Sequence, residues 1–121
     1  MANILVVERE CEVRELLCNV FESGGHQVIL SVSGDGGLFA LRADKDIEIV
    51  TTNLNLPDQD MDGYEFIRRA KEEFPNIKSV LITGSPLQEE VSVNAFNVGF
   101  DRVLFKPFSN RVLLAVIVGL A

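Results

Sequence analysis

Residues 3–32 read "NILVVERECEVRELLCNVFESGGHQVILSV" and contain the pattern that decides the fold. The first five of these residues form a short apolar, β-branched run, which is typical of a strand buried on both faces. Residues 10–23 place apolar side chains at helical spacing, and a Gly-Gly pair ends that helix. Residues 27–32 are a second apolar run of strand length. The stretch therefore predicts a strand, a helix and a second strand in succession.

The same alternation continues to the end of the chain. Further helices are expected over residues 35–43, 63–74 and 87–98 and from residue 109 onward, and further strands over residues 48–53, 78–83 and 102–105. Parallel neighbours need crossover connections, and these crossovers are right-handed. We therefore predict an α/β fold with a doubly wound five-stranded parallel sheet and helices on both of its faces.

Composition indicates one compact acidic domain spanning residues 1–121. A chain of 121 residues with 47% hydrophobic and 24% charged residues has the material for one sizeable core. The net charge of −7 argues against an electrostatic grip on nucleic acid phosphates, so we expect no direct nucleic acid binding.

The cysteines and the apolar runs indicate in which cellular compartment the domain is expected. Cys11 and Cys18 are separated by about 10 Å along the expected helix, too far for a disulfide, which favours a reducing setting. No export signal is visible, and the apolar run at residues 112–121 is about half of a membrane span. We expect a cytoplasmic domain with no membrane contact.

The topology locates a site before any family is considered. In open parallel sheets, ligands bind outside the carboxyl ends of the strands. Five side chains follow or end a predicted strand: Glu8, Arg9, Asn53, Thr83 and Lys106. We expect these side chains to form one cluster.

Several ordered motifs carry a family resemblance. They are "ILVV" followed by acidic residues, "LNLP" with a later "MDGYEF", "VLITG", and "VGFDRVLFKPF". Over nearly its whole length the chain resembles the CheY-like receiver domain of two-component response regulators. The resemblance implies a flavodoxin-like (βα)5 fold and a signalling role that is not enzymatic. The domain would stand alone or form the N-terminal part of a longer regulator.

In that family an acidic pair and the Asp that ends the third strand hold Mg²⁺, and this Asp takes a phosphoryl group from a histidine kinase. A Thr and a Lys contact the phosphoryl oxygens, and an aromatic residue three positions before the Lys changes rotamer. This sequence keeps Thr83 and Lys106. It departs from the pattern at the acidic pair, which is Glu8 and Arg9, at the acceptor, which is Asn53, and at the aromatic position, which is Val103.

The identity of the acceptor position depends on the register. The segment between Pro57 and Met61 holds two more residues than the family usually has, so counting back from Asp62 would move the acceptor to Asn55. Both registers give an amide, and the strand "EIVTTN" favours Asn53.

An amide changes the chemistry. A neutral Asn is a very poor nucleophile and brings no charge to a divalent cation. We therefore predict a pseudo-receiver that does not accept phosphate and acts as a phosphorylation-independent module. Glu8 is expected to pair with Arg9 or Lys106, and the Asn53 amide to hydrogen-bond nearby. No cofactor is expected, and Mg²⁺ would bind only in a more competent pocket.

Two other functions remain as alternatives. The first is a phosphorylatable switch whose native acceptor Asp has been replaced by Asn53. The second is a flavin-binding enzyme of similar topology, which is disfavoured because no hydroxyl-rich phosphate loop follows "NILVV".

The acidic loop "DQDMDG" allows two interpretations. Asp58, Asp60 and Asp62 match the start of a calcium-binding loop, but the twelfth position is Arg69 where a Glu is needed. The favoured interpretation is that Asp62 caps the following helix, with Glu65 completing a capping box.

Two smaller features are weaker candidates. The segment "TGSP" at residues 83–86 precedes a helix and could hold a small anion beside Lys106, although a loop without a ligand is the favoured interpretation. His26 follows the Gly-Gly pair, and we expect it to be a solvated loop residue.

The final helix points to protein partners. Its ten consecutive apolar residues cannot all face one core, and we expect Val112, Val116 and Ile117 to form an interface. The resemblance places dimerisation or output contacts on the surface of the fourth helix, fifth strand and fifth helix. The expected partners are a histidine kinase, an output module or a second copy of the chain.

Overall fold

A computed structural model describes all residues from 1 to 121. The strands are β1 (Asn3–Val7), β2 (Gln27–Ser31), β3 (Ile49–Asn53), β4 (Lys78–Thr83) and β5 (Arg102–Phe105). The helices are α1 (Cys11–Ser23), α2 (Gly34–Ala43), α3 (Gly63–Glu73), α4 (Gln88–Val98) and α5 (Asn110–Leu120). Every predicted strand and helix is confirmed, with bounds that differ by a residue or so at some ends.

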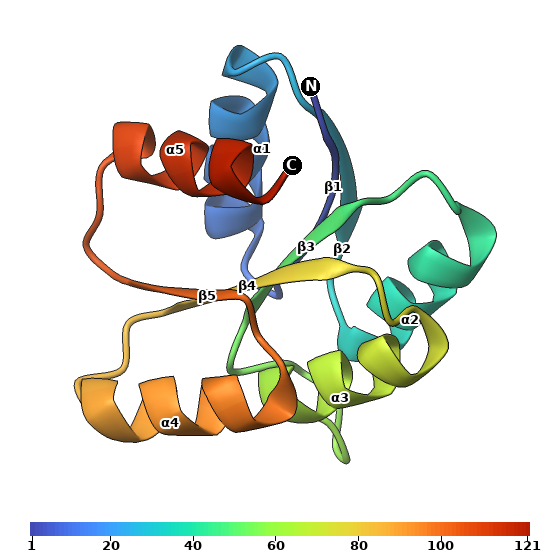
Figure 1. Cartoon of the computed structure of the whole chain (residues 1–121), viewed down its shortest axis with the longest axis vertical. Coiled ribbons are helices and arrows are strands. Elements are labelled where there is room, and N and C mark those ends of the chain that lie inside the picture. The colour runs from blue at the N-terminus through green and yellow to red at the C-terminus, as the bar shows by residue number, and fades with distance from the viewer.

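The five strands form one parallel sheet in the order β2-β1-β3-β4-β5. Helices α1 and α5 cover one face of the sheet, and α2, α3 and α4 cover the other (Figure 1). The predicted doubly wound α/β fold is therefore confirmed. The order places β2 and β5 at the two edges and β3 in the centre, so Asn53 ends the central strand.

Alternate residues of the central strands supply the two cores. In β1, Leu5 and Val7 belong to the cluster under α2, α3 and α4, whereas Ile4 and Val6 belong to the cluster under α1 and α5. This period of two is the geometry of a pleated strand buried on both faces. It explains why "ILVV" is apolar without interruption.

Helix α3 begins against the end of β3. The N–H of Gly63 donates to the Leu54 carbonyl at 2.8 Å. A Cβ at Gly63 would meet the carbonyl oxygen of Asn53 and lie 3.0 Å from the Cα of Leu54. The absence of a side chain at Gly63 therefore lets α3 approach the backbone of the site residue.

His26 is buried, so the prediction of a solvated loop residue is wrong. Its side chain is 7% exposed, and Nδ1 accepts a hydrogen bond from the Ala2 N–H at 3.0 Å. The turn after α1 folds back on the start of β1, which places the imidazole against the backbone there. Burial lowers the pKa of His26 below its usual 6.5, and the positive charge of the N-terminus lowers it further, while Glu48 opposes the shift.

This lowered pKa predicts a loss of stability in mild acid. The unfolded chain takes up a proton at His26 at higher pH than the folded protein does, and protonated Nδ1 cannot accept from Ala2. The contribution is therefore present above about pH 6.5 and decreases as pH falls toward the folded-state pKa. We expect the urea midpoint to fall more steeply between pH 7.5 and 5.5 in the native protein than in His26→Asn. Equal slopes would contradict this assignment.

Candidate functional site

The carboxyl end of the sheet brings together four of the five predicted side chains. Glu8 follows β1, Asn53 ends β3, Thr83 ends β4 and Lys106 follows β5. Arg9 points elsewhere and is exposed. The predicted cluster therefore forms without Arg9.

Glu8 and Asn53 make the central contact of this site. The Glu8 side chain is 2% exposed, and its Oε1 accepts a hydrogen bond from Nδ2 of Asn53 at 3.1 Å. Its Oε2 accepts from the Glu10 N–H at 2.8 Å. On the other side of the amide, Oδ1 of Asn53 accepts from the Leu54 N–H at 2.7 Å. The amide thus satisfies a buried carboxylate and a backbone donor at the same time.

The expected ion pair of Glu8 with Arg9 or Lys106 is wrong. None of the ion pairs in the structure involves Glu8. Glu8 and Arg9 both lie beyond the end of β1, where the chain bends at Arg9, and there Glu8 is buried while Arg9 is exposed. The predicted hydrogen bonding of the Asn53 amide is confirmed.

Arg14 also supports the site, and the sequence analysis did not predict this role. Its Nη1 donates to the Glu8 carbonyl at 2.9 Å and to the Arg9 carbonyl at 3.2 Å. Arg14 thereby holds the β1–α1 loop that carries the buried carboxylate. Its place in the charged first turns of α1 gave no sign of this contact.

A pocket of about 440 Å³ lies beside the amide, between the ends of β3, β4 and β5. Its lining consists of Asn53, Leu54, Asn55, Thr83, Gly84, Ser85 and Lys106. Oγ1 of Thr83, which is buried, accepts from the Ser85 N–H at 3.2 Å, whereas the Lys106 side chain is exposed and makes no ion pair. The lining therefore carries one positive charge and no carboxylate.

The structure distinguishes the two candidate registers. Asn53 pairs with Ile82 in the sheet and contacts Glu8, whereas Asn55 is exposed in the following loop. The position that ends the strand is Asn53, as the sequence predicted.

Val103 lies at the predicted aromatic position in β5. It pairs with Leu81 and packs, half-buried, against the core under α2, α3 and α4. Valine has no ring that could swing between a buried and an exposed rotamer.

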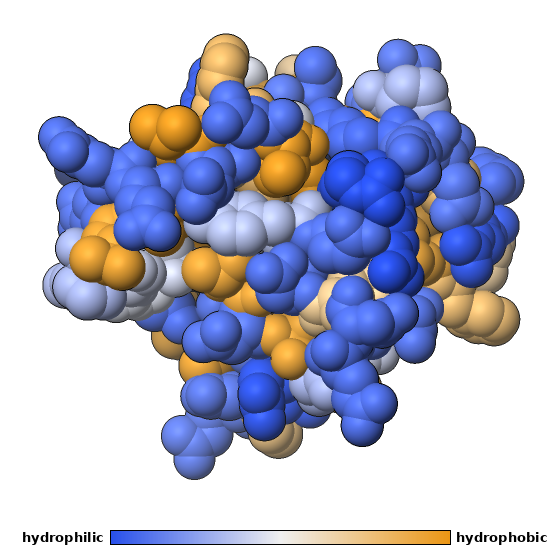
Figure 2. Space-filling view, turned by 90° about the horizontal axis from the view of Figure 1, so that it is seen from below, coloured by the Kyte–Doolittle hydropathy of each residue, from blue (hydrophilic) through white to orange (hydrophobic).

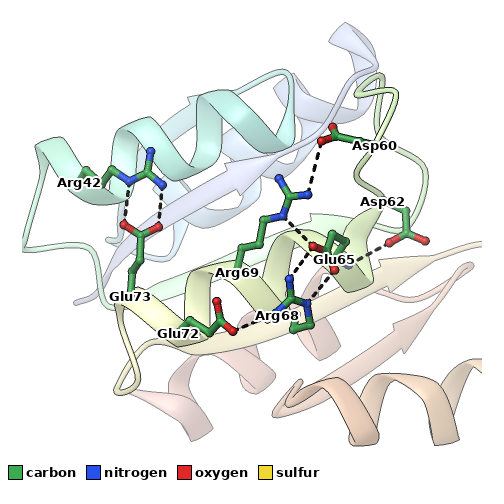
Figure 3. Close-up of polar contacts among 8 residues, drawn as sticks. All are labelled: Arg42, Asp60, Asp62, Glu65, Arg68, Arg69, Glu72 and Glu73. Carbon is green, nitrogen blue, oxygen red and sulfur yellow. Dashed lines mark hydrogen bonds and ion pairs between the residues drawn. The ribbon is translucent and has the colours of Figure 1, made fainter.

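The three acidic candidates for metal binding face three different partners. The two oxygens of Asp58 accept from the N–H groups of Gly34 and Asp35, at 2.8 and 3.0 Å. Asp60 pairs with Arg69 at 3.5 Å, and Asp62 accepts from the Glu65 N–H at 2.9 Å (Figure 3). No group of three acidic, His or Cys side chains in the chain is placed to hold a metal ion. The three carboxylates that match the start of a calcium-binding loop therefore do not converge on one point.

The cap on α3 is confirmed only in part. Asp62 caps the helix as predicted, but Glu65 does not return a bond to the Asp62 backbone. Instead its carboxylate lies between Arg68 and Arg69, and hydrogen bonds from these residues lower its pKa to about 2 (Figure 3). The guanidinium groups hold Glu65 away from the helix start.

One of the three interface residues predicted on the final helix, Ile117, is wrong. Ile117 is fully buried in the core under α1 and α5, so it cannot be a surface contact. Val112 is 44% exposed and Val116 is partly buried. The spacing of Leu113 and Ile117 turns one face of α5 toward the sheet, and Val112 and Val116 lie beside that face.

The surface on the α3–α4 side has a mixed character. Figure 2 shows apolar side chains there in small groups, scattered among hydrophilic ones. None of the helices is both long enough and apolar enough to cross a bilayer.

The order of the strands and the superposition on solved receiver domains define the class, a CheY-like receiver fold. The chain belongs to the response regulator receiver domain family, which it matches over residues 4–118. Such domains are signalling modules of two-component response regulators and not classical enzymes.

Comparisons with individual proteins agree with this membership. The chain is 28% identical over 114 residues to response regulator SaeR of Staphylococcus aureus. The aligned region covers 94% of this chain and 48% of SaeR. It thus spans about half the length of the curated relatives it matches. A CheY-like receiver domain protein from Methanospirillum hungatei superimposes with a TM-score of 0.88 at 26% identity, covering 98% of this chain and 92% of that one. A receiver domain protein from Clostridium thermocellum gives 0.89 at 23% identity, covering 98% and 93%.

Proposed function

We propose that this chain is a pseudo-receiver, a response regulator domain that does not take up phosphate at residue 53 and works as a phosphorylation-independent interaction module. The observation that carries the proposal is the Asn53 amide, bound between the Glu8 carboxylate and the Leu54 N–H. A neutral amide lacks the anionic oxygen that attacks phosphorus.

The charge around the amide supports the same function. Mg²⁺ prefers several hard oxygen ligands that carry negative charge. Glu8 is the only carboxylate that reaches Asn53, and both of its oxygens already accept hydrogen bonds. A cation entering here would have to displace the amide and the Glu10 N–H, and it would lie close to the Lys106 ammonium.

A partner would then recognise a single conformation of the domain, one that does not change with phosphorylation. We propose a histidine kinase or an output module as the partner, with contacts on the surface of α4, β5 and α5. Val112 on α5 and Val93 on α4 are exposed apolar side chains on these elements, and both are available for such a contact.

The test is chemical. The protein is incubated with Mg²⁺ and acetyl phosphate, and its intact mass is measured, with a receiver that carries an acceptor Asp as the positive control. We expect the mass of this protein to stay unchanged while the control gains a phosphoryl group. A phosphoryl adduct located at residue 53 would refute the proposal.

A further inference from the structure

The two edges of the sheet differ in how they are protected. An edge strand presents unpaired N–H and C=O groups, and charged side chains commonly keep other strands away from it. At one edge, β5 begins with the exposed Arg102 and is followed by the exposed Lys106. At the other edge, residues 27–33 read "QVILSVS", with no charge and no proline. The edge at β2 is therefore unprotected.

The backbone of β2 shows which groups are free. The Gln27 N–H donates to the Ala2 carbonyl, and the Ser31 carbonyl accepts from the Glu8 N–H. In a parallel ladder the residues that bond to one neighbour alternate, so Gln27, Ile29 and Ser31 face β1. The N–H and C=O groups of Val28 and Leu30 therefore point outward, where no strand of this chain pairs with them.

The side chains at this edge are apolar and partly open to solvent. Leu30 is 46% exposed, Val32 just beyond the strand is 53% exposed, and Val28 is partly exposed. Val28 and Leu30 alternate along the strand and share the face covered by α1, which itself exposes Leu16 at 56%, and Val32 follows in the bend after the strand. A row of free backbone groups thus runs beside an apolar stripe.

We infer that β2 pairs with β2 of a second copy of this chain, antiparallel and about a two-fold axis beside Ile29. A two-fold axis makes a surface its own partner, and an edge strand is self-complementary in that arrangement because every donor meets an acceptor. In this register Val28 lies opposite Leu30 of the second copy and exchanges both of its backbone hydrogen bonds with it. The stripe of one copy then meets the stripe of the other, and the two sheets become continuous.

Local charge does not oppose a second copy at the β2 edge, whereas two β5 edges would bring Arg102 and Lys106 of both copies together. Strand β2 contains no ionisable side chain, so the paired strands themselves bring no like charges together. Each copy nevertheless carries a net charge of −7, and the two whole molecules repel over longer distances. Pairing should therefore strengthen with added salt, which screens this repulsion.

Hydrogen exchange tests the seam directly. The Val28 and Leu30 amides are followed at low and at several hundred micromolar protein, in low and in moderate salt. We expect their exchange to slow as concentration and salt rise, while exposed amides elsewhere keep their rates. Fast exchange of both amides under every condition would overturn the inference.

Matched variants complete the test. Leu30→Lys places a charge at the seam, and Val118→Lys places the same charge on α5, where Val118 is 65% exposed. By sedimentation equilibrium, Leu30→Lys should raise the dimer dissociation constant by a factor on the order of ten or more, whereas Val118→Lys should leave it unchanged. A native protein that stays monomeric, or equal weakening by both variants, would overturn the inference. The exchange measurement on the native protein decides the matter even where Leu30→Lys folds poorly.

Discussion

The variant Asn53→Asp is expected to be less stable than the native protein by about 1–3 kcal/mol at pH 7 in metal-free buffer. The substitution replaces the Nδ2 donor, 3.1 Å from Oε1 of Glu8, with an oxygen that cannot donate. Two carboxylates then face each other where a hydrogen bond existed, and one of them is buried. Urea unfolding with a chelator present measures the loss.

Magnesium should reverse much of this loss in the variant. Two adjacent carboxylates provide the charged oxygens that Mg²⁺ prefers, and a ligand that binds only the folded state raises stability with its concentration. We expect millimolar Mg²⁺ to raise the urea midpoint of Asn53→Asp and to leave that of the native protein nearly unchanged.

Asn55→Asp is the matched control. Asn55 lines the same pocket but is exposed and makes no contact with Glu8. The same change there should alter stability by about 0.5 kcal/mol or less, with no response to Mg²⁺. Similar losses in both variants would show that general pocket charge, and not the contact with Glu8, sets the effect.

Gly63→Ala is expected to lower the free energy of unfolding by about 1–3 kcal/mol. The new Cβ would overlap the Asn53 carbonyl oxygen and press on the Leu54 Cα at 3.0 Å. Both obstacles are backbone atoms, so no side chain can rotate away to make room. Helix α3 would have to move off the end of β3 and weaken the bond from Gly63 N–H to the Leu54 carbonyl.

Gly119→Ala separates this clash from the general effect of replacing glycine. A Cβ at Gly119 in α5 meets nothing within 4 Å. Alanine favours a helix over glycine by up to about 1 kcal/mol, so this variant should be as stable as the native protein or more so. Urea unfolding of both variants gives the comparison, and an unchanged midpoint for Gly63→Ala would contradict the close approach of α3.

The fold could be predicted from the sequence because its signals are local and repeated. The strand "ILVV" and the glycine pair after the first helix set one strand-helix-strand unit, and the same pattern recurs along the chain. Asn53 could be placed as well, since a parallel sheet puts the carboxyl ends of its strands at one edge.

The errors concern directions that periodicity leaves open. Glu8 and Arg9 are neighbours in sequence that both lie beyond the last residue of β1, so the alternation within the strand does not fix which of them is buried. Ile117 stands in a run of apolar residues that hides which face meets the core. His26 follows a turn, and it contacts Ala2, which is 24 residues away in the sequence. The residues next to His26 give no sign of this long-range contact.

The amide between Glu8 and Leu54 has a consequence for timing under the proposed function. An acyl phosphate forms and is later hydrolysed, so the lifetime of this bond sets how long an ordinary receiver stays in its phosphorylated state. The hydrogen bonds of Asn53 require neither a donor of phosphate nor a phosphatase. Under the proposed function, the active state of such a domain has no lifetime set by phosphorylation. Its signalling output then depends on the concentration of the protein, which is set by synthesis and degradation.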